Sequence, residues 1–335
     1  MQFGKVPLAE AEGAILAHSV MEGGGRFRKG MLLGPDEIAA LAAAGVHDVM
    51  IARIEVGDVG EDVAAARLAN ALVPDLSAAG LAASAAFTGR VNLNATRAGI
   101  VEMDVGAIHA LNRLDPAITF ATLAPWTRVH HGLLVGTVKI ITYAVSEAAL
   151  SKALQIAQDA IRIRPVALRD ASLVMTEVPG LPDKLNAKGR EAIEGRLSAL
   201  GMTLASCVTV PHEEAAIAAA LAAAPGQLLL ILTGSATSDL MDTAPQAVRQ
   251  GGGQVARFGM PVDPGNLLFH GHIGARPVIG LPGCARSPAL NGADWVLERI
   301  ACGLPVSDDD MAAMGVGGLL KEIPIRPQPR ERVGR

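Results

Sequence analysis

The chain has 335 residues, of which half are hydrophobic and only 3 % aromatic, and its formal net charge is −4. This length exceeds what one hydrophobic core usually serves, so two or more domains are expected. No basic patch is interleaved with aromatic residues, which argues against a nucleic-acid partner, and no apolar run reaches the roughly 18–20 residues that span a bilayer.

The N-terminus and the cysteines point to a protein of a reducing compartment. The first residues, MQFGKVPLAEAEG, show no basic-then-apolar signal pattern. The three cysteines, Cys207, Cys284 and Cys302, are odd in number and lack metal-ligand spacing. Disulfides and structural zinc are therefore disfavoured, and a cytoplasmic location is expected.

Residues 1–70 form an N-terminal segment in which one helix and one strand are predicted. Pro35, followed by Asp36 and Glu37, opens a helix through residue 44, and Gly45 ends it. Residues 49–54 then read as a strand. Residues 60–85 are rich in alanine and predict a helix that connects this segment to the next domain.

Residues 71–165 predict a smaller α+β domain. Strands are expected at 89–95, 99–104, 117–123 and 133–145, and helices at 105–114 and 147–161. Asp104 and Ser146 are the predicted caps of these helices. Lys139 lies inside the apolar stretch LLVGTVKII, where it either faces solvent on an edge strand or contacts a phosphate or carboxylate.

Residues 166–304 alternate strand and helix, which predicts a three-layer α/β domain with a mostly parallel sheet and helices on both faces. Its predicted strands cover 166–178, 202–210, 228–232, 254–260, 267–272 and 277–281, and its predicted helices cover 188–200, 212–224, 245–250 and a final segment to about 301. The two strands on either side of Gly274 predict a hairpin. Residues 305–335 read as a tail.

The candidate site begins at the end of the apolar run 228–232. Small residues follow this run, and open α/β sheets bind ligands at the carboxyl ends of their strands. The candidate substrate-binding residues in this first loop are Thr233, Gly234, Ser235, Ala236, Thr237, Ser238 and Asp239. The alternative for this stretch is an ordinary strand-to-helix loop with a capping residue.

A second stretch, IGLPGCARS, repeats this pattern. An apolar strand ends in Pro282 and Gly283, and Ser287 is placed before a helix whose free N–H groups favour anions. Two such loops at neighbouring strand ends predict a cleft for a phosphorylated small molecule. Lys188, near the start of an earlier helix, is a further candidate phosphate contact, or else a solvated lysine.

The motifs TGSATSDLMDTAPQAV, PVDPGNLLFHG and VIGLPGCARSPAL resemble the molybdopterin-binding domain of the MoeA and MogA types of molybdenum-cofactor biosynthesis proteins. The N-terminal motifs VPLAEAEGAILAHSV and RKGMLLGPDEIAALAAAGVHDVMI also resemble the flank of the MoeA type. The resemblance covers roughly residues 5–55 and 166–304. It implies a MogA-like fold and a cytoplasmic protein that binds molybdopterin.

The resemblance implies that the first loop, together with Pro282, Gly283 and Ser287, holds the pterin and its phosphate. It also places Asp242 at the acidic residue of the family, as a catalytic group or as the ligand of Mg²⁺. Molybdate or ATP would be the second substrate of such an enzyme. Partners would be a nucleotidyltransferase or a molybdoenzyme, and a homo-oligomer is expected.

Several positions depart from the family pattern. Ser235 replaces the second glycine of the first loop, His212 and Glu213 stand where an aspartate is usual, and Lys188 and Gly189 stand where an Asp-Ser-Asn segment often opens a helix. Two functions therefore stay open: a molybdotransferase-like or adenylylating enzyme, and a carrier or accessory module that binds without turnover. A CinA-type nucleotide hydrolase of the same fold is a third candidate.

Overall fold

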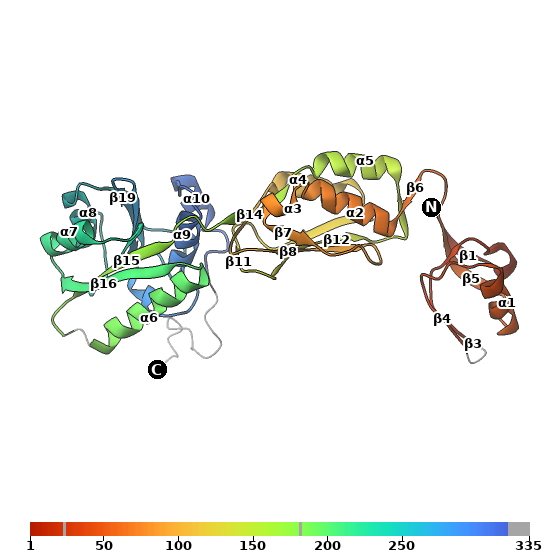
Figure 1. The fold of residues 1–335 in the computed structure, drawn as a ribbon, viewed down its shortest axis with the longest axis horizontal. Helices are drawn as coiled ribbons and strands as arrows, with labels where there is room; N and C mark the ends of the chain where they lie inside the picture. The colour runs from red at the N-terminus through yellow and green to blue at the C-terminus, as the bar shows by residue number, and fades with distance from the viewer. Residues whose placement is uncertain (23–24, 181–182, 321–335) are drawn as a thin grey trace, which may run out of the picture. The chain divides into compact units, whose positions relative to one another are not determined.

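A computed structural model of the protein describes residues 1–22, 25–180 and 183–320. The chain divides into two compact units (Figure 1). The first unit comprises Met1–Thr96, Val101–Pro125 and His131–Ile163, and the second, here the α/β unit, comprises Arg97–Ile100, Trp126–His130 and the chain from Arg164 onward. No helix in the described part of the chain is long and apolar enough to cross a membrane.

The first unit contains small antiparallel sheets and short helices. Its strands are β1 (Gln2–Pro7), β2 (Ile15–Leu16), β3 (Val20–Glu22), β4 (Gly25–Phe27), β5 (Asp48–Arg53), β6 (Asp58–Gly60), β7 (Leu81–Ala83), β8 (Arg90–Ala95), β10 (Ile118–Thr122), β12 (Leu134–Ile140) and β13 (Ala144–Ser146). Its helices are η1 (Leu8–Glu10), α1 (Pro35–Ala43), α2 (Glu61–Leu72), α3 (Leu76–Ala79), α4 (Val105–Leu114) and α5 (Glu147–Ile156).

The helix predicted from Pro35 is present as α1. The side chain of Glu37 accepts a hydrogen bond of 3.0 Å from the N–H of Gly34, and Gly45 follows the helix with a left-handed φ of 85°. Strand β5 pairs with β1 and β2, and its Val49 and Ile51 are buried in a small core with Leu41 of α1. Local capping and apolar spacing therefore sufficed to locate these elements.

Three predicted segments of the first unit differ from the structure. The alanine-rich stretch is split at Pro74 into α2 and α3, because proline lacks the N–H that a continuous helix needs. The stretch 133–145 is also divided, since β12 pairs with β8 and β10 whereas β13 pairs with β6. Helix α5 ends at Ile156, and Asp159 then turns the chain with a positive φ of 50°.

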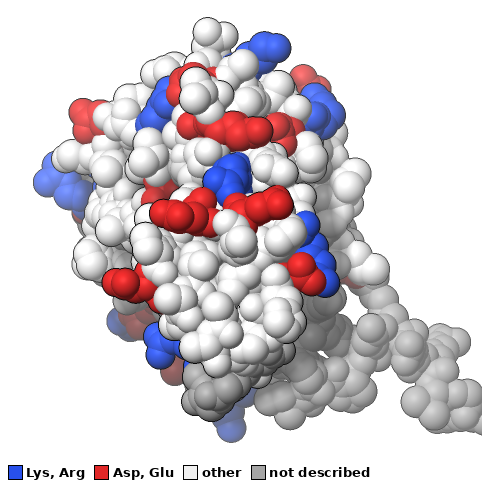
Figure 2. All heavy atoms as spheres, turned by 90° about the vertical axis from the view of Figure 1, so that its right-hand side faces the viewer, with Lys and Arg blue, Asp and Glu red and all other residues white. Residues whose placement is uncertain are grey.

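Charges of both signs are interspersed on the face of the molecule drawn in Figure 2, without a continuous basic area. Ion pairs such as Lys5 with Asp48, at 3.2 Å, and Arg67 with Glu147, at 2.6 Å, belong to the first unit. The strands that lie at the sequence boundaries between the units are β9 (Gly99–Met103), β11 (Arg128–Val129) and β14 (Ile161–Pro165).

The α/β unit is built on a six-stranded sheet of order β16-β15-β17-β20-β19-β18. Its strands are β15 (Asp170–Glu177), β16 (Thr203–Pro211), β17 (Leu228–Leu232), β18 (Gln254–Phe258), β19 (Phe269–Ile273) and β20 (Arg276–Leu281). Its helices are α6 (Asp183–Ala199), α7 (Glu214–Ala223), α8 (Thr243–Gln250), η2 (Gly283–Arg286), α9 (Gly292–Ala301) and α10 (Asp308–Ala313).

The sheet is mixed, but most of its strands run in one direction, as predicted. Strands β16, β15, β17 and β20 pair in parallel, β19 runs antiparallel to β20, and β18, which pairs antiparallel with β19, has the same direction as the four parallel strands. The hairpin predicted around Gly274 joins β19 to β20, and Gly274 has a left-handed φ of 57°. The structure is thus a multidomain α/β protein, and the finer MogA-like assignment stays a prediction.

Helices cover both faces of this sheet, as predicted. All five residues of β17 are fully buried: Leu228, Leu230 and Leu232 face a core shared with α6, α9 and α10, while Leu229 and Ile231 face a core shared with α7 and α8. In Figure 1, α7 and α8 lie on one side of β15 and β16 and α6 lies on the other. Each fully buried leucine contributes roughly 1.5–3 kcal/mol, so this strand anchors both layers.

The chain after residue 304 contains a further helix. Helix α10 begins at the capping residue Ser307, and its Met311 is fully buried in the same core as α6 and α9. The described part of the predicted tail therefore packs with the α/β unit. The rest of the tail, residues 321–335, lies outside the described residues.

Candidate functional site

The two predicted loops follow adjacent strands. Leu232, the last residue of β17, pairs with Leu281 of β20 on one side and with Met175 of β15 on the other. Thr233 and Pro282 follow directly after this paired position. The first loop, residues 233–239, and the second loop, residues 282–287, therefore leave the same edge of the sheet side by side.

This edge contains the point where the chain reverses its direction across the sheet. From β15 the chain passes through α6 to β16 on one side, and α7 then brings it back past β15 to β17. Helices α6 and α7 pack on opposite faces. Connections that diverge in this way leave a crevice beyond the carboxyl ends of the strands, where open α/β sheets bind ligands.

The first loop combines buried anchors with an exposed stretch. Thr233 and Thr237 are buried, whereas Ser235, Ala236 and Ser238 are exposed. The backbone N–H groups of Ser235, Ala236 and Thr237 donate no hydrogen bond to any other described residue. Three consecutive donors are thus available at the carboxyl edge of the sheet.

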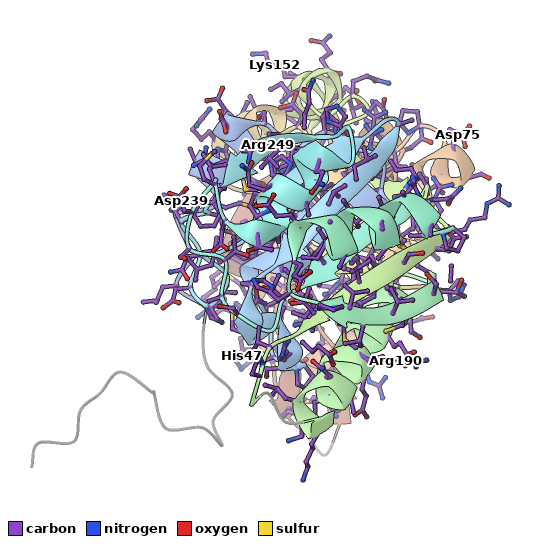
Figure 3. The ribbon with its side chains drawn as sticks, turned by 90° about the vertical axis from the view of Figure 1, so that its left-hand side faces the viewer. His47, Asp75, Lys152, Arg190, Asp239 and Arg249 are labelled. Atoms are coloured by element: carbon purple, nitrogen blue, oxygen red, sulfur yellow. The ribbon has the colours of Figure 1, made fainter. Side chains whose placement is uncertain are left out.

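Asp239 and Asp242 shape the end of this loop. Asp239 is exposed, and its Oδ1 accepts a hydrogen bond of 2.7 Å from the N–H of Met241. Arg249, on α8, donates to the carbonyl of Leu240 at 2.6 Å. Figure 3 shows Asp239 on the loop that precedes α8, with Arg249 on that helix. Both contacts lie where the first loop leads into α8.

Asp242 is the N-cap of α8. Its Oδ1 accepts from the N–H of Thr243 at 2.7 Å, and its Oδ2 accepts from the N–H and the hydroxyl of Ser238 at 2.9 and 3.2 Å. Burial alone raises the pKa of Asp242, but these hydrogen bonds outweigh burial and hold that pKa below its usual value, with a smaller contribution from His212. A carboxylate of this kind stays ionised at neutral pH and is a weak proton acceptor.

Thr176, at the end of β15, connects the first loop to His212. Its Oγ1 accepts a hydrogen bond of 2.8 Å from the N–H of Gly234 and lies 2.9 Å from Nδ1 of His212. The threonine hydroxyl has one proton and two acceptor lone pairs, so it can hydrogen-bond both groups at once. His212, which stands where the family pattern has an aspartate, is thus joined to the loop through Thr176.

The second loop differs locally from the prediction. Gly283–Arg286 forms the short 3-10 helix η2, with Pro282 and Ser287 at its ends, whereas the following α-helix begins at Gly292 with Asn291 as its cap. Ser287 therefore does not cap a helix: its Oγ accepts from the N–H of Ala289 at 3.3 Å. The helix predicted to follow Ser287 is α9, and its N-cap, Asn291, lies four residues after Ser287.

A buried ion pair fixes the second loop. Arg196 of α6 donates to Asp294 of α9 at 2.6 Å, and both side chains are almost fully buried. The remaining guanidinium donors of Arg196 reach the carbonyls of Ala192, Ala285, Ser287 and Ala289 at 2.8–3.2 Å. All three guanidinium nitrogens of Arg196 therefore donate hydrogen bonds, and these bonds hold the second loop in place.

Arg286, at the end of η2, contacts the first loop. Its Nη2 donates to the carbonyl of Thr233 at 3.0 Å, whereas its buried Nη1 has no partner among the described residues. Burial lowers the pKa of Arg286. Gly189 of α6 lies against this side chain: a Cβ at that position would come within 2.9 Å of Leu232 and 3.3 Å of Arg286. Arg286 belongs to the second motif, but no local sequence signal predicts its contact with Thr233, which is 53 residues away in the chain.

A cavity of about 740 Å³ lies between α6, η2 and the segment that follows η2. Its lining comprises Arg128, Lys188, Glu191, Ala192, Gly195, Arg196, Ala199, Arg286, Ser287, Pro288, Leu290 and Asp294. Of the predicted residues, Ser287 and Lys188 line this α6–η2 cavity, whereas the first loop does not. Arg286 is the lining residue that also contacts the first loop.

Lys139 belongs to the first unit. Its Nζ donates to the carbonyl of Thr88 and lies 3.8 Å from Glu61 Oε2. Burial raises the pKa of Glu61, and Lys139 opposes that rise. Lys139 thus has local partners, and its contact with a phosphate stays a prediction.

Comparisons with known proteins name no activity for this chain. A family profile described as "Domain of unknown function (DUF8806)" matches residues 5–53. No curated protein matches. Among solved structures, the chain is similar to a molybdopterin biosynthesis MoeA protein from Pyrococcus horikosii, with 12 % identity, a TM-score of 0.32, and coverage of 90 % of this chain and 76 % of that one. At that identity and TM-score the similarity supports no argument about function.

Proposed function

We propose that the α/β unit binds a phosphorylated small molecule at the carboxyl edge of its sheet, between the first and second loops. The observation that carries this proposal is the row of three unused N–H groups, from Ser235 to Thr237, in a loop that leaves β17 beside the end of β20. Free backbone N–H groups in small-residue loops are a recurrent phosphate site, because they supply partial positive charge without a bulky side chain.

We further propose molybdopterin as the ligand. This assignment rests on the resemblance of the motifs around Thr233, Asp242 and Pro282 to the molybdopterin-binding domain. The exposed residues Ser235 and Ala236 leave room for a ligand to approach the backbone. A pterin supplies a flat ring system, and its phosphate supplies the anion that the loop requires.

Mg²⁺ fits the described residues poorly. No group of three or more His, Cys, Asp or Glu side chains in the described part of the chain is placed to hold a metal ion. Both carboxylate oxygens of Asp242 already accept hydrogen bonds from Ser238 and Thr243. We assign no step to Mg²⁺, and its binding by Asp242 stays a prediction.

Binding without turnover is the form of this function that the geometry supports best. Asp242, the predicted catalytic group, has a lowered pKa and serves as a helix cap, so it is poorly suited to accept a proton. The protein would then act as a carrier or accessory module for a nucleotidyltransferase or a molybdoenzyme. The enzyme alternative uses molybdate or ATP as second substrate.

Molybdopterin binding is tested with the full chain and two matched variants. Ala236→Glu places a carboxylate among the three free N–H groups, whereas Ala219→Glu places one on the exposed surface of α7. We expect the wild type and Ala219→Glu to quench the fluorescence of molybdopterin with similar affinity, and Ala236→Glu to bind at least roughly tenfold more weakly because like charges repel. Absence of molybdopterin binding by the wild type would contradict the proposal.

Turnover is tested separately with molybdopterin, Mg²⁺ and either molybdate or ATP. The carrier form predicts no product with the wild type or with Asp242→Ala, although both bind the pterin. Product that forms with the wild type and disappears in Asp242→Ala would establish the enzyme instead.

A further inference from the structure

We infer that the α6–η2 cavity is a phosphate subsite, in which Lys188 and Arg286 hold the phosphate of an organic ligand while its uncharged ring lies over Ala192, Gly195 and Ala199. Naming the ligand as a pterin rests on the proposed function, but the phosphate subsite stands on the cavity itself. It extends the anion site of the first loop, through Arg286, to two cations on α6 and η2.

The charges of the cavity favour an anion. Its lining carries four cations, on Arg128, Lys188, Arg196 and Arg286, against two carboxylates, on Glu191 and Asp294. Two of the cations are already paired within the α/β unit, Arg196 with Asp294 at 2.6 Å and Arg128 with Glu298 at 3.5 Å. Lys188 and Arg286 form no ion pair with any described residue, so they are the cations available to a ligand.

Arg286 is held by the first loop and keeps one donor nitrogen unpaired among the described residues. Its Nη2 is fixed by the carbonyl of Thr233 at 3.0 Å, and its Nη1 is buried with no acceptor among the described residues. An unpaired donor of this kind is costly unless a ligand supplies the missing acceptor. Phosphate oxygens match the planar guanidinium geometry, and lysine adds a point charge.

The rest of the lining suits a ring. Ala192, Gly195 and Ala199 present small side chains along one stretch of α6, and Pro288 and Leu290 add apolar surface from the segment after η2. A volume of about 740 Å³ falls within the range of small-molecule sites. Glu191, which forms no ion pair with any described residue, is placed to accept hydrogen bonds from N–H groups on the edge of such a ring.

Arg286 also connects the subsite to the first loop. Through Thr233, the same side chain contacts the residue from which that loop leaves β17. A phosphate that binds Arg286 would therefore stabilise the end of β17 beside the three free N–H groups. The two regions would act as one elongated site, with Arg286 between them.

The experiment uses the full chain with three ligands: molybdopterin, its dephosphorylated form and inorganic pyrophosphate. The variants are Lys188→Gln and Arg286→Gln, and the matched control is Lys184→Gln, which is exposed on α6 and does not line the cavity. Binding is measured by pterin fluorescence and by the rate at which a maleimide alkylates Cys284, the exposed thiol within η2.

We expect pyrophosphate to slow alkylation of Cys284 in the wild type and in Lys184→Gln. Lys188→Gln and Arg286→Gln should each bind pyrophosphate and molybdopterin at least roughly tenfold more weakly, because a charge-assisted hydrogen bond is lost. Their affinity for the dephosphorylated pterin should be unchanged. Lys188 is exposed, so Lys188→Gln tests the inference even if Arg286→Gln does not fold.

The outcomes separate this inference from the proposed function. If molybdopterin binds equally to the wild type and to both variants, the subsite is overturned and pterin binding stands. If no pterin binds but pyrophosphate protects Cys284 in a manner that requires Lys188 and Arg286, the subsite stands and the pterin function fails. Pyrophosphate that neither protects Cys284 nor distinguishes the variants would overturn the subsite as well.

Discussion

The backbone N–H of Gly234 donates a hydrogen bond of 2.8 Å to Oγ1 of Thr176, which joins the first loop to the end of the neighbouring strand β15. The threonine is fully buried and its hydroxyl also meets His212 Nδ1 at 2.9 Å. One hydroxyl group therefore hydrogen-bonds both the loop N–H of Gly234 and the ring of His212 at the carboxyl edge of the sheet. The two tryptophans, Trp126 and Trp295, both lie in the α/β unit, so their fluorescence reports unfolding of this unit.

Replacing Thr176 with valine should destabilise the α/β unit by about 1–3 kcal/mol, because the N–H of Gly234 and Nδ1 of His212 lose their partner. Thr209→Val on β16 is the control, since Thr209 is exposed and its change should stay within about 0.5 kcal/mol. Urea unfolding followed by tryptophan fluorescence measures both. Equal stabilities of the two variants would contradict the proposed role of the hydroxyl.

Arg196 should be far more important to stability than Arg190, although both lie on α6 and both pair with a carboxylate. Arg196→Met leaves the buried Asp294 and four carbonyl groups without their donor, which should cost about 3–5 kcal/mol. Arg190→Met removes an exposed pair with Glu194 at 2.9 Å, which solvent screens, so it should change the stability far less. The same urea titration compares them, and similar losses would show that the buried pair does not hold the second loop.

The capping role of Asp242 predicts a moderate loss of stability in Asp242→Ala, of about 0.5–2 kcal/mol, because the first turn of α8 loses its acceptor. Asp242→Asn retains a capping oxygen and should lose less. Asp309→Ala, an exposed change in the first turn of α10, is the matched control and should cost a few tenths of a kcal/mol, about the size of a helix-dipole contact. If Asp242→Ala keeps its full stability but loses turnover, the residue is catalytic rather than a cap.

Glu298 should make the stability of the α/β unit depend on pH. Burial raises the pKa of this carboxyl to about 7, Asp294 adds to the rise, and Arg128 at 3.5 Å opposes it. In the unfolded chain the carboxyl titrates at its usual value of 4.5. The folded protein therefore binds the proton more tightly, and its stability falls as pH rises from about 4.5 to about 7, by roughly 3 kcal/mol in total.

Glu298→Gln should remove this dependence, because its side chain is neutral at every pH. The wild type should lose about 3 kcal/mol relative to Glu298→Gln between pH 4.5 and 8, whereas Glu214→Gln, an exposed change on α7, should follow the wild type. Urea unfolding at these two pH values supplies the measurement. Parallel behaviour of the wild type and Glu298→Gln would show that Glu298 titrates normally in the fold.

Local patterns in the sequence located much of the fold. The apolar run 228–232 is the fully buried strand β17, and Pro35, Asp104 and Ser146 stand at the starts of the helices they were expected to open. These signals succeed because periodicity and capping involve residues within about one turn of each other. The two loops that follow buried strands were found by the same reasoning.

Only the tertiary structure decided what surrounds those loops. It brought Thr176 to Gly234, Arg286 to Thr233 and Arg196 to Asp294, which are 58, 53 and 98 residues apart in the chain. It also placed β19 between β18 and β20 in the sheet and packed α10 into the core. Strand order and side-chain direction depend on burial shared by distant segments, and no local spacing encodes them. The sequence thus determined where loops follow the buried strands β17 and β20, while the packing of α6 and η2 decided which cations stand beside them.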